Sequence, residues 1–243
     1  MLQFFSNLFG EDEQGTIILL SALLVALICI VVASVMSGKV AKNAKKAREA
    51  GQAFEQLALA VAQLCDSKDK FVNGHSKRVA NISVAIGKEL KYPDLDKLYF
   101  TALLHDIGNI AIPDNILLRS GRLTPDEFAI MMNHTDIGAE FLDSVKAVPK
   151  LSYGAKYHHE HVDGSGYNYC LDGSHTPLEG KIVGVAEAYD AMTSDRSYRM
   201  GLSANAAVEE LKRCSGTQFD KEVANALVSA IKNGFTPDKD VRK

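Results

Sequence analysis

Apolar residues follow two contrasting patterns along this chain, first one continuous run and then a periodic spacing. From Thr16 to Met36 no charged residue occurs, and Ile, Leu, Val and Ala dominate. A helix needs roughly 20 consecutive apolar residues to cross the hydrocarbon core of a bilayer. The run therefore predicts one transmembrane helix at residues 16–37, preceded by a short acidic extracytoplasmic tail at residues 1–15.

Basic residues follow the apolar run directly and set its expected orientation. Residues 1–15 contain no lysine or arginine, whereas five basic residues come just after the run: Lys39, Lys42, Lys45, Lys46 and Arg48. Because cytoplasmic flanks of membrane helices are enriched in such residues, we expect a single-pass protein of the inner (cytoplasmic) membrane with a cytoplasmic body. The alternative, a cleaved signal peptide, has a shorter apolar stretch behind a positively charged start. With a tail this short, we expect no extracytoplasmic sensor domain.

The second pattern is a helical period that continues to the end of the chain. Residues 38–64 carry apolar side chains at Phe54, Leu57, Val61 and Leu64, which predicts a juxtamembrane helix that could also pair with a second copy. A capping box beginning at Thr124 announces a further helix. More helices are expected in a segment opened by His75 and at residues 95–104, 151–158, 181–194, 203–213 and 221–232. No period-two alternation appears, so residues 65–243 are predicted to form an all-α, helical-bundle domain.

Composition changes this picture little. The formal net charge is −3, so nothing global suggests a nucleic-acid polymer as a partner. The cysteines show no metal-ribbon spacing and are expected to be reduced thiols: Cys29, Cys65, Cys170 and Cys214.

The histidines give the first indication of chemistry. Five of the seven are candidate ligands: His75, His105, His134, His158 and His159. His105 precedes Asp106, and an imidazole beside a carboxylate suits Zn, Mn or Fe. Glu187 and Asp190 share one face of an expected helix. Several helices could gather these residues around two divalent metal ions about 3.5–4 Å apart, with a carboxylate such as Asp106 between them.

The order of these residues resembles the HD-GYP family of cyclic di-GMP phosphodiesterases. The motifs that carry the resemblance are His105-Asp106-Ile107-Gly108, His158-His159-Glu160, the loop at residues 163–167 and the segment at residues 188–199. The resemblance covers roughly residues 54–235. It implies an all-α HD fold, a bi- or trinuclear metal centre, and hydrolysis of cyclic di-GMP to linear pGpG or GMP.

Carried over residue by residue, the resemblance also implies roles. The expected metal ligands are His75, His105, Asp106, His134, His158, His159 and Glu187, with Asp106 bridging the ions. Asp106 and Asp190 are expected to be catalytic. The expected substrate contacts are Arg196 and Arg199 on phosphate, Tyr167 stacked on a guanine, and Asn109. The remaining histidines, His161 and His175, are expected to be solvated loop residues.

The chain departs from the family pattern at several positions. Asn109 stands where the family usually has lysine, which removes a positive charge near the substrate phosphate. Glu187 replaces an aspartate, and Asn168 replaces a proline and leaves the Gly-Tyr loop less rigid. Phe71 stands where trinuclear members carry a glutamate ligand, so we expect two ions of Fe, Mn or Zn.

These observations support one leading hypothesis and two alternatives. The leading hypothesis is a membrane-anchored, metal-dependent phosphodiesterase acting on cyclic di-GMP, with a homodimer as a possible assembly. The first alternative is a degenerate cyclic di-GMP receptor with little turnover, suggested by Asn109 and Asn168. The second is an HD phosphohydrolase for another nucleotide, because a two-metal site does not by itself define the substrate.

Overall fold

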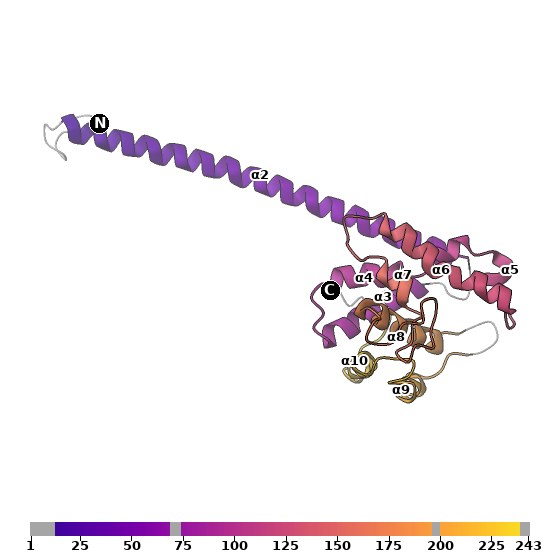
Figure 1. The fold of residues 1–243 in the computed structure, drawn as a ribbon. Helices are drawn as coiled ribbons and strands as arrows, with labels where there is room; N and C mark the ends of the chain where they lie inside the picture. Colours follow the sequence, from indigo (N-terminus) through magenta and orange to yellow (C-terminus); the bar gives the residue numbers. More distant parts are fainter. Residues whose placement is uncertain (1–12, 69–73, 196–199, 239–243) are drawn as a thin grey trace. The chain divides into compact units, whose positions relative to one another are not determined.

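The computed structural model describes residues 13–68, 74–195 and 200–238, and the side chains among them except those of residues 13–22 and 35. Across these ranges the regular structure is helical, with two isolated β-bridges and no strand (Figure 1). The expected all-α fold is confirmed. The chain divides into two compact units, residues 1–55 and 56–243.

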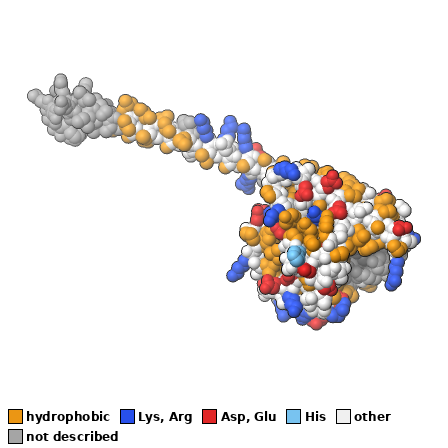
Figure 2. Space-filling view, in the orientation of Figure 1, with side chains coloured by type: hydrophobic (Ala, Val, Ile, Leu, Met, Phe, Trp, Pro, Cys, Tyr) orange, Lys and Arg blue, Asp and Glu red, His pale blue; other side chains and the backbone are white. Residues whose placement is uncertain are grey.

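Helix α2 (Glu13–Asp66) is continuous through the regions expected to be membrane span and juxtamembrane helix. It already begins inside the stretch that we expected to be an extracytoplasmic tail. In the part of α2 whose side chains are described, apolar residues from Leu23 to Val32 are exposed, and basic residues follow them (Figure 2). Within the described residues, one helical stretch is long and apolar enough to cross a membrane.

The last turns of α2 belong to the second unit and pack on it through small side chains. Ala58, Ala62 and Cys65 are buried in the core, whereas Leu57 and Leu64 are 65% and 57% exposed. Small side chains let the helix approach its neighbours closely. The apolar period at Leu57 and Leu64 therefore does not mark the face that packs on the body.

The body is built around α3 (His75–Glu89), most of which is buried. It packs against α4 (Leu95–Leu103), α8 (Leu178–Thr193) and α10 (Lys221–Lys232). The other helices are η1 (Ile107–Ala111), α5 (Asp114–Leu117), α6 (Pro125–Asp143), α7 (Tyr153–Tyr157) and α9 (Ala204–Arg213). This arrangement brings the ends of α4 and α7 and the start of α3 close to the middle of α6 and α8.

Local sequence signals explain several helix boundaries. At the start of α6, Thr124 Oγ1 accepts from Glu127 N and Glu127 Oε2 accepts from Thr124 N, so the expected capping box forms. The expected helix at residues 151–158 is shorter, covering only Tyr153–Tyr157. The two short helices η1 and α5 were not anticipated, because segments of four or five residues are too short to show a helical period.

Candidate metal centre

Five helical elements deliver the expected ligands to one place. His75 is the first residue of α3, the His105-Asp106 pair follows α4, and His134 lies on α6. His158 and His159 follow α7, and Glu187 lies on α8. Among the described residues, two groups of ligand atoms share no member, each with its atoms within 4.8 Å of one another: His134, His158 and His159 in the first group, and His75, His105 and Glu187 in the second group. A third set, His105, Asp106 and His158, links the two groups.

Asp106 lies between these two groups. Its Oδ2 is 3.9 Å from His75 Nε2 and 3.6 Å from His105 Nε2. Its Oδ1 is 3.6 Å from His134 Nε2 and 3.7 Å from His158 Nε2. These distances exceed hydrogen-bond lengths and lie near the roughly 3.4 Å that separates two ligand atoms of a tetrahedral ion with bonds of about 2.1 Å. The two oxygens thus face different ligand groups, as a bridging carboxylate requires.

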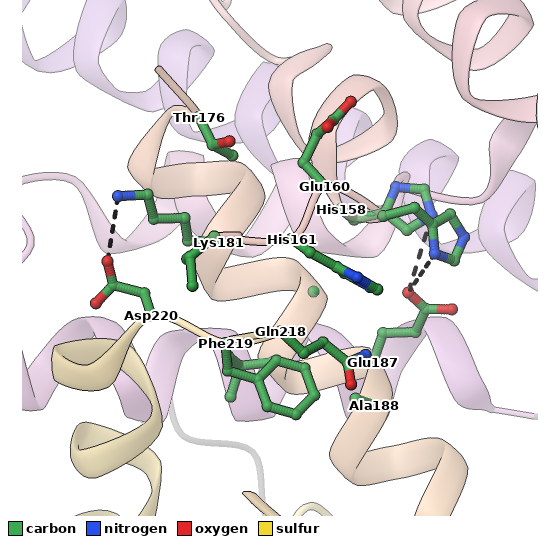
Figure 3. A pocket seen from close by; sticks show the side chains of 14 residues that line it. His158, Glu160, His161, Thr176, Lys181, Glu187, Ala188, Gln218, Phe219 and Asp220 are labelled. Carbon is green, nitrogen blue, oxygen red and sulfur yellow. Dashed lines mark hydrogen bonds and ion pairs between the residues drawn. The ribbon is translucent and has the colours of Figure 1, made fainter. Parts of the chain in front are cut away.

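Glu187 reaches both groups from α8. Its Oε2 lies 3.9 Å from His158 Nε2 and 3.9 Å from His159 Nδ1. Figure 3 shows the side chain of Glu187 facing His158. It also belongs to the group of His75 and His105. The glutamate in place of the usual aspartate therefore retains a carboxylate at the centre.

Hydrogen bonds at the far side of the rings fix the tautomers of three histidines. His105, His134 and His158 each donate from Nδ1 to a backbone carbonyl three or four residues earlier, at 2.7, 2.7 and 2.8 Å. With the proton on Nδ1, each Nε2 presents a lone pair to the centre. The buried Nε2 of His105 has no hydrogen-bond partner among the described residues, which suits a metal ligand.

His75 is supported differently, by a buried ion pair. Its Nδ1 donates to Asp190 Oδ2 at 2.7 Å, and Arg78 Nε donates to Asp190 Oδ1 at 2.6 Å. Burial alone would lower the pKa of His75, but the hydrogen bond to Asp190 together with the charges of the nearby carboxylates raises the pKa above its ordinary value. Asp190 is only 1% exposed, and both of its oxygens are engaged. In this structure Asp190 contacts His75 and Arg78, and its expected catalytic role stays a prediction.

The pKa shifts of three histidines and of Asp106 favour the forms that bind metal. Burial, with the charge of neighbouring histidines, lowers the pKa of His105, His158 and His159, the last to about 3. For Asp106, burial favours the neutral form, but the surrounding histidines outweigh it and hold the pKa below its ordinary value. Neutral imidazoles around an ionised carboxylate are the forms that bind divalent cations.

Two of the expected substrate contacts have other partners in this structure. The ring of Tyr167 stacks on His159, with centroids 4.5 Å apart and planes at 27°, so the ring expected to stack on guanine lies against a ligand. Asn109 lies in η1, and its backbone carbonyl accepts a hydrogen bond from Lys68 Nζ at 3.1 Å. Arg196, Arg199 and Phe71 fall outside the described residues, so their expected roles are not addressed.

Asn168 compensates for the missing proline in a way that the sequence did not reveal. Its side-chain amide donates to Met132 O at 3.1 Å and to Thr135 Oγ1. Both acceptors lie on α6, next to the ligand His134. The Gly-Tyr loop is therefore held to α6 by hydrogen bonds where the family uses a rigid ring.

A cavity of about 210 Å³ adjoins the centre along α8. Figure 3 shows Glu187 at one side and the Lys181–Asp220 ion pair at the other, with His161 between them. His161 is thus half-buried rather than a solvated loop residue, and its Nδ1 lies 2.9 Å from Ser165 Oγ. The expectation for His175 is confirmed, because its side chain is 72% exposed.

Comparison with known proteins identifies the family of this chain. The family model described as "HD domain" matches residues 60–223. The chain is 39% identical over 184 residues to a cyclic di-GMP phosphodiesterase of Thermotoga maritima, covering 74% of this chain and 50% of that protein. It is 31% identical over 175 residues to a 3'3'-cGAMP-specific phosphodiesterase of Vibrio cholerae, covering 71% and 41%. The chain thus spans about half or less of the length of these relatives.

Solved structures agree on the fold. A cyclic GMP-AMP specific phosphodiesterase of V. cholerae superposes with a TM-score of 0.59 at 19% identity, covering 73% of this chain and 48% of that one. An HDGYP protein of Bdellovibrio bacteriovorus gives a TM-score of 0.55 at 22% identity, covering 68% and 53%. The chain belongs to the HD domain family, within its HD-GYP group.

Proposed function

We propose that this chain is a metal-dependent phosphodiesterase that hydrolyses a cyclic dinucleotide, with cyclic di-GMP as its substrate and linear pGpG as the main product. The observation that carries the proposal is Asp106, whose two carboxylate oxygens face separate groups of ligand atoms. Such an arrangement supports two divalent ions, of Fe, Mn or Zn. The names of the relatives supply the substrate class.

The side chains divide the work of such a reaction among them. When bound, the two ions supply Lewis acidity toward the phosphate and the attacking water. Asp106 holds the two ligand groups at a fixed separation. Three histidines keep Nε2 unprotonated through hydrogen bonds at Nδ1. Asp190 fixes the ring of His75, and Arg78 keeps Asp190 ionised, which orients the ligand before substrate arrives.

Two observations favour turnover over a receptor role, although the chain departs from the family pattern at several positions. All seven expected ligands converge, and Asn168 retains a loop attachment through α6. Asn109 remains a real loss of charge, so we propose a slow enzyme. The second cleavage leaves less substrate to hold, so hydrolysis largely stops at the linear dinucleotide.

Membrane anchoring through α2 is part of the proposal. Its support is the uncharged run, the basic residues after it, and the exposure of its described apolar side chains. A reporter fused after Lys243 should behave as cytoplasmic, and the protein should stay in membranes after carbonate extraction. Activity of this reporter on the extracytoplasmic side of the membrane would contradict this orientation.

Pairing of two copies remains a prediction. Leu57 and Leu64 are exposed on the second unit and offer an apolar contact. A cysteine introduced at Leu57 should give a disulfide-linked dimer in membranes. A matched cysteine at Gln63, on the same helix but outside this stripe, should give less.

The central experiment measures metal content and turnover on the same full-length protein in detergent. We expect about two divalent ions per chain and metal-dependent conversion of cyclic di-GMP to pGpG. Three ions at full occupancy would contradict the binuclear assignment. Cyclic di-GMP binding without hydrolysis would establish the receptor, and faster hydrolysis of 3'3'-cGAMP or of another nucleotide would change the substrate.

A further inference from the structure

A lysine just beyond α2 sits in a cage of oxygens beside the metal centre. Lys68 Nζ donates to the carbonyls of Asn109, Ile110 and Ile112 at 3.1, 3.2 and 2.7 Å. It also lies 3.1 Å from Asp114 Oδ1. Three carbonyl dipoles pointing at one place repel one another unless a cation lies between them. The ammonium group of Lys68 therefore holds together a backbone conformation that the carbonyls alone disfavour.

That backbone is η1, which starts directly after the bridging residue Asp106. Asn109 N donates to Asp106 O at 3.0 Å, so η1 and the backbone of Asp106 move together. On its other side η1 packs on α6: a Cβ at Gly108 would lie 1.9 Å from His134 O. Segment η1 therefore lies between Lys68 on one side and the backbone of His134, on α6, on the other side.

The same end of α2 also forms hydrogen bonds with the segment that carries His75. Asp66 Oδ1 accepts from Ser76 Oγ at 2.6 Å, and Asp66 Oδ2 accepts from Ser76 N at 3.3 Å. Both side chains are buried, so solvent does not compete for these hydrogen bonds. Asp66 therefore holds the residue next to His75, and Lys68 holds the segment that follows Asp106.

We propose that Lys68 is a positioning residue: its ammonium group acts as a tethered cation that fixes η1 and, together with Asp66, sets Asp106 at the correct distance from the histidines. The described contacts of the Lys68 ammonium group are with backbone carbonyls after Asp106 and with the Asp114 carboxylate, so it acts through these groups and not as a metal ligand. The proposal concerns geometry at the site of the proposed function, and its primary measurement is metal affinity, which does not require turnover.

The test compares Lys68→Ala with Lys97→Ala in the full-length protein. Lys97 is a matched control, because its side chain is also 19% exposed and its ammonium lies 3.5 Å from the carboxylate of Glu179, on the first turn of α8. Lys68→Ala should weaken divalent-metal affinity about 10–100-fold, the usual effect of losing support behind a ligand. Lys97→Ala should leave that affinity within about twofold of wild type, since it supports no ligand.

A rescue experiment separates the tethered cation from a general structural role. Butylamine or ammonium can place a cation back among the same oxygens, so adding it should restore much of the metal affinity of Lys68→Ala and change neither wild type nor Lys97→Ala. The neutral analogue butanol should restore nothing. Loss of affinity without rescue, unchanged affinity in Lys68→Ala, or an equal loss in Lys97→Ala would each overturn the proposal.

A second variant keeps the test decisive if Lys68→Ala does not fold. Asp114→Asn removes only the carboxylate from the cage and should lower metal affinity less than Lys68→Ala, with a Tm close to wild type. NMR shows whether the folded Asp114→Asn protein has lost the contact between position 114 and Lys68. If that contact is lost and the metal affinity is unchanged, the inference is contradicted. If the affinities change as expected while no variant or wild type hydrolyses a cyclic dinucleotide, only the proposed function fails.

Discussion

The two ligand groups of this centre are held in different ways. In the first group, His134 and His158 donate from Nδ1 to carbonyls within one helical turn of their own positions. In the second group, His75 relies on Asp190, which lies 115 residues later in the chain. His134 and His158 of the first group, and His105 of the second, are therefore oriented by local helix geometry, whereas His75 of the second group depends on the packing of α3 against α8.

The difference indicates that the two ions should not respond equally to mutation. Local support survives as long as α6 and α7 remain folded. Tertiary support is lost with one side chain, because nothing else in the described contacts of His75 Nδ1 replaces the carboxylate. We expect the second group to release its ion first when the domain is perturbed.

The largest effect should come from Asp106, which lies between the two groups. Asp106→Ala should abolish turnover and metal binding by both groups, because the ions lose the carboxylate that lies between them and repel each other. Metal analysis and a cyclic di-GMP assay measure this. Asp126→Ala, at an exposed position on the first turn of α6, is the control. Retained activity in Asp106→Ala would rule out a two-metal mechanism here.

The next largest effect should distinguish the groups. Asp190→Asn keeps the shape but weakens the hydrogen bond that orients His75, so the affinity for one ion should fall about 10–100-fold while the other ion stays bound. A metal titration should change from one step to two. Equal weakening of both ions would show that the groups are not independently supported.

A substitution outside both groups should change rate without changing metal affinity. Asn109→Lys adds a positive charge close to Asp106, and a single transition-state donor is commonly worth 10²–10³ in rate. Because bound ions already neutralise part of the phosphate charge, we expect a rise in kcat of about tenfold, larger than any change in KM. Steady-state kinetics with both proteins decide this. Equal rates would place Asn109 outside the charge-stabilising environment.

The smallest effect should come from the loop attached to α6 beside the first group. Asn168→Ala removes the side-chain hydrogen bonds to Met132 O, Thr135 Oγ1 and Asp136 Oδ2, and should lower the free energy of unfolding by about 1–2 kcal/mol, with KM raised a few-fold. Asn168→Pro should recover part of the KM through rigidity alone. Denaturant unfolding and kinetics measure both. A lower KM in Asn168→Ala than in wild type would show that the attachment opposes substrate binding.

Much of the fold and the centre was predictable because the relevant signals are local. The capping box at Thr124 marks the start of α6, and the His105-Asp106 and His158-His159 pairs lie at helix ends that the apolar periods already indicate. Proximity of these pairs follows from the family resemblance, since no single helix could gather them. The same signals gave the correct fold class.

The parts that could not be predicted depend on side-chain direction after packing. Asp190 shares a helix face with Glu187, yet it turns to His75 and Arg78, which only the placement of α3 decides. Lys68 and Asn168 bond to backbone groups of distant segments, and backbone acceptors leave no mark in a sequence. The apolar period at Leu57 and Leu64 does not identify the face of α2 that packs on the body, because the small side chains of Ala58 and Ala62 make that contact.

The buried Nε2 of His105 links metal supply to the lifetime of the protein. A buried polar nitrogen without a hydrogen-bond partner destabilises a fold by about 1–3 kcal/mol, and a coordinated ion removes that penalty. Any ion that binds the folded chain alone also adds stability by mass action. In a metal-starved cell the chain would therefore unfold more often and be degraded sooner. Its abundance, and not only its catalytic rate, would follow the concentration of available metal.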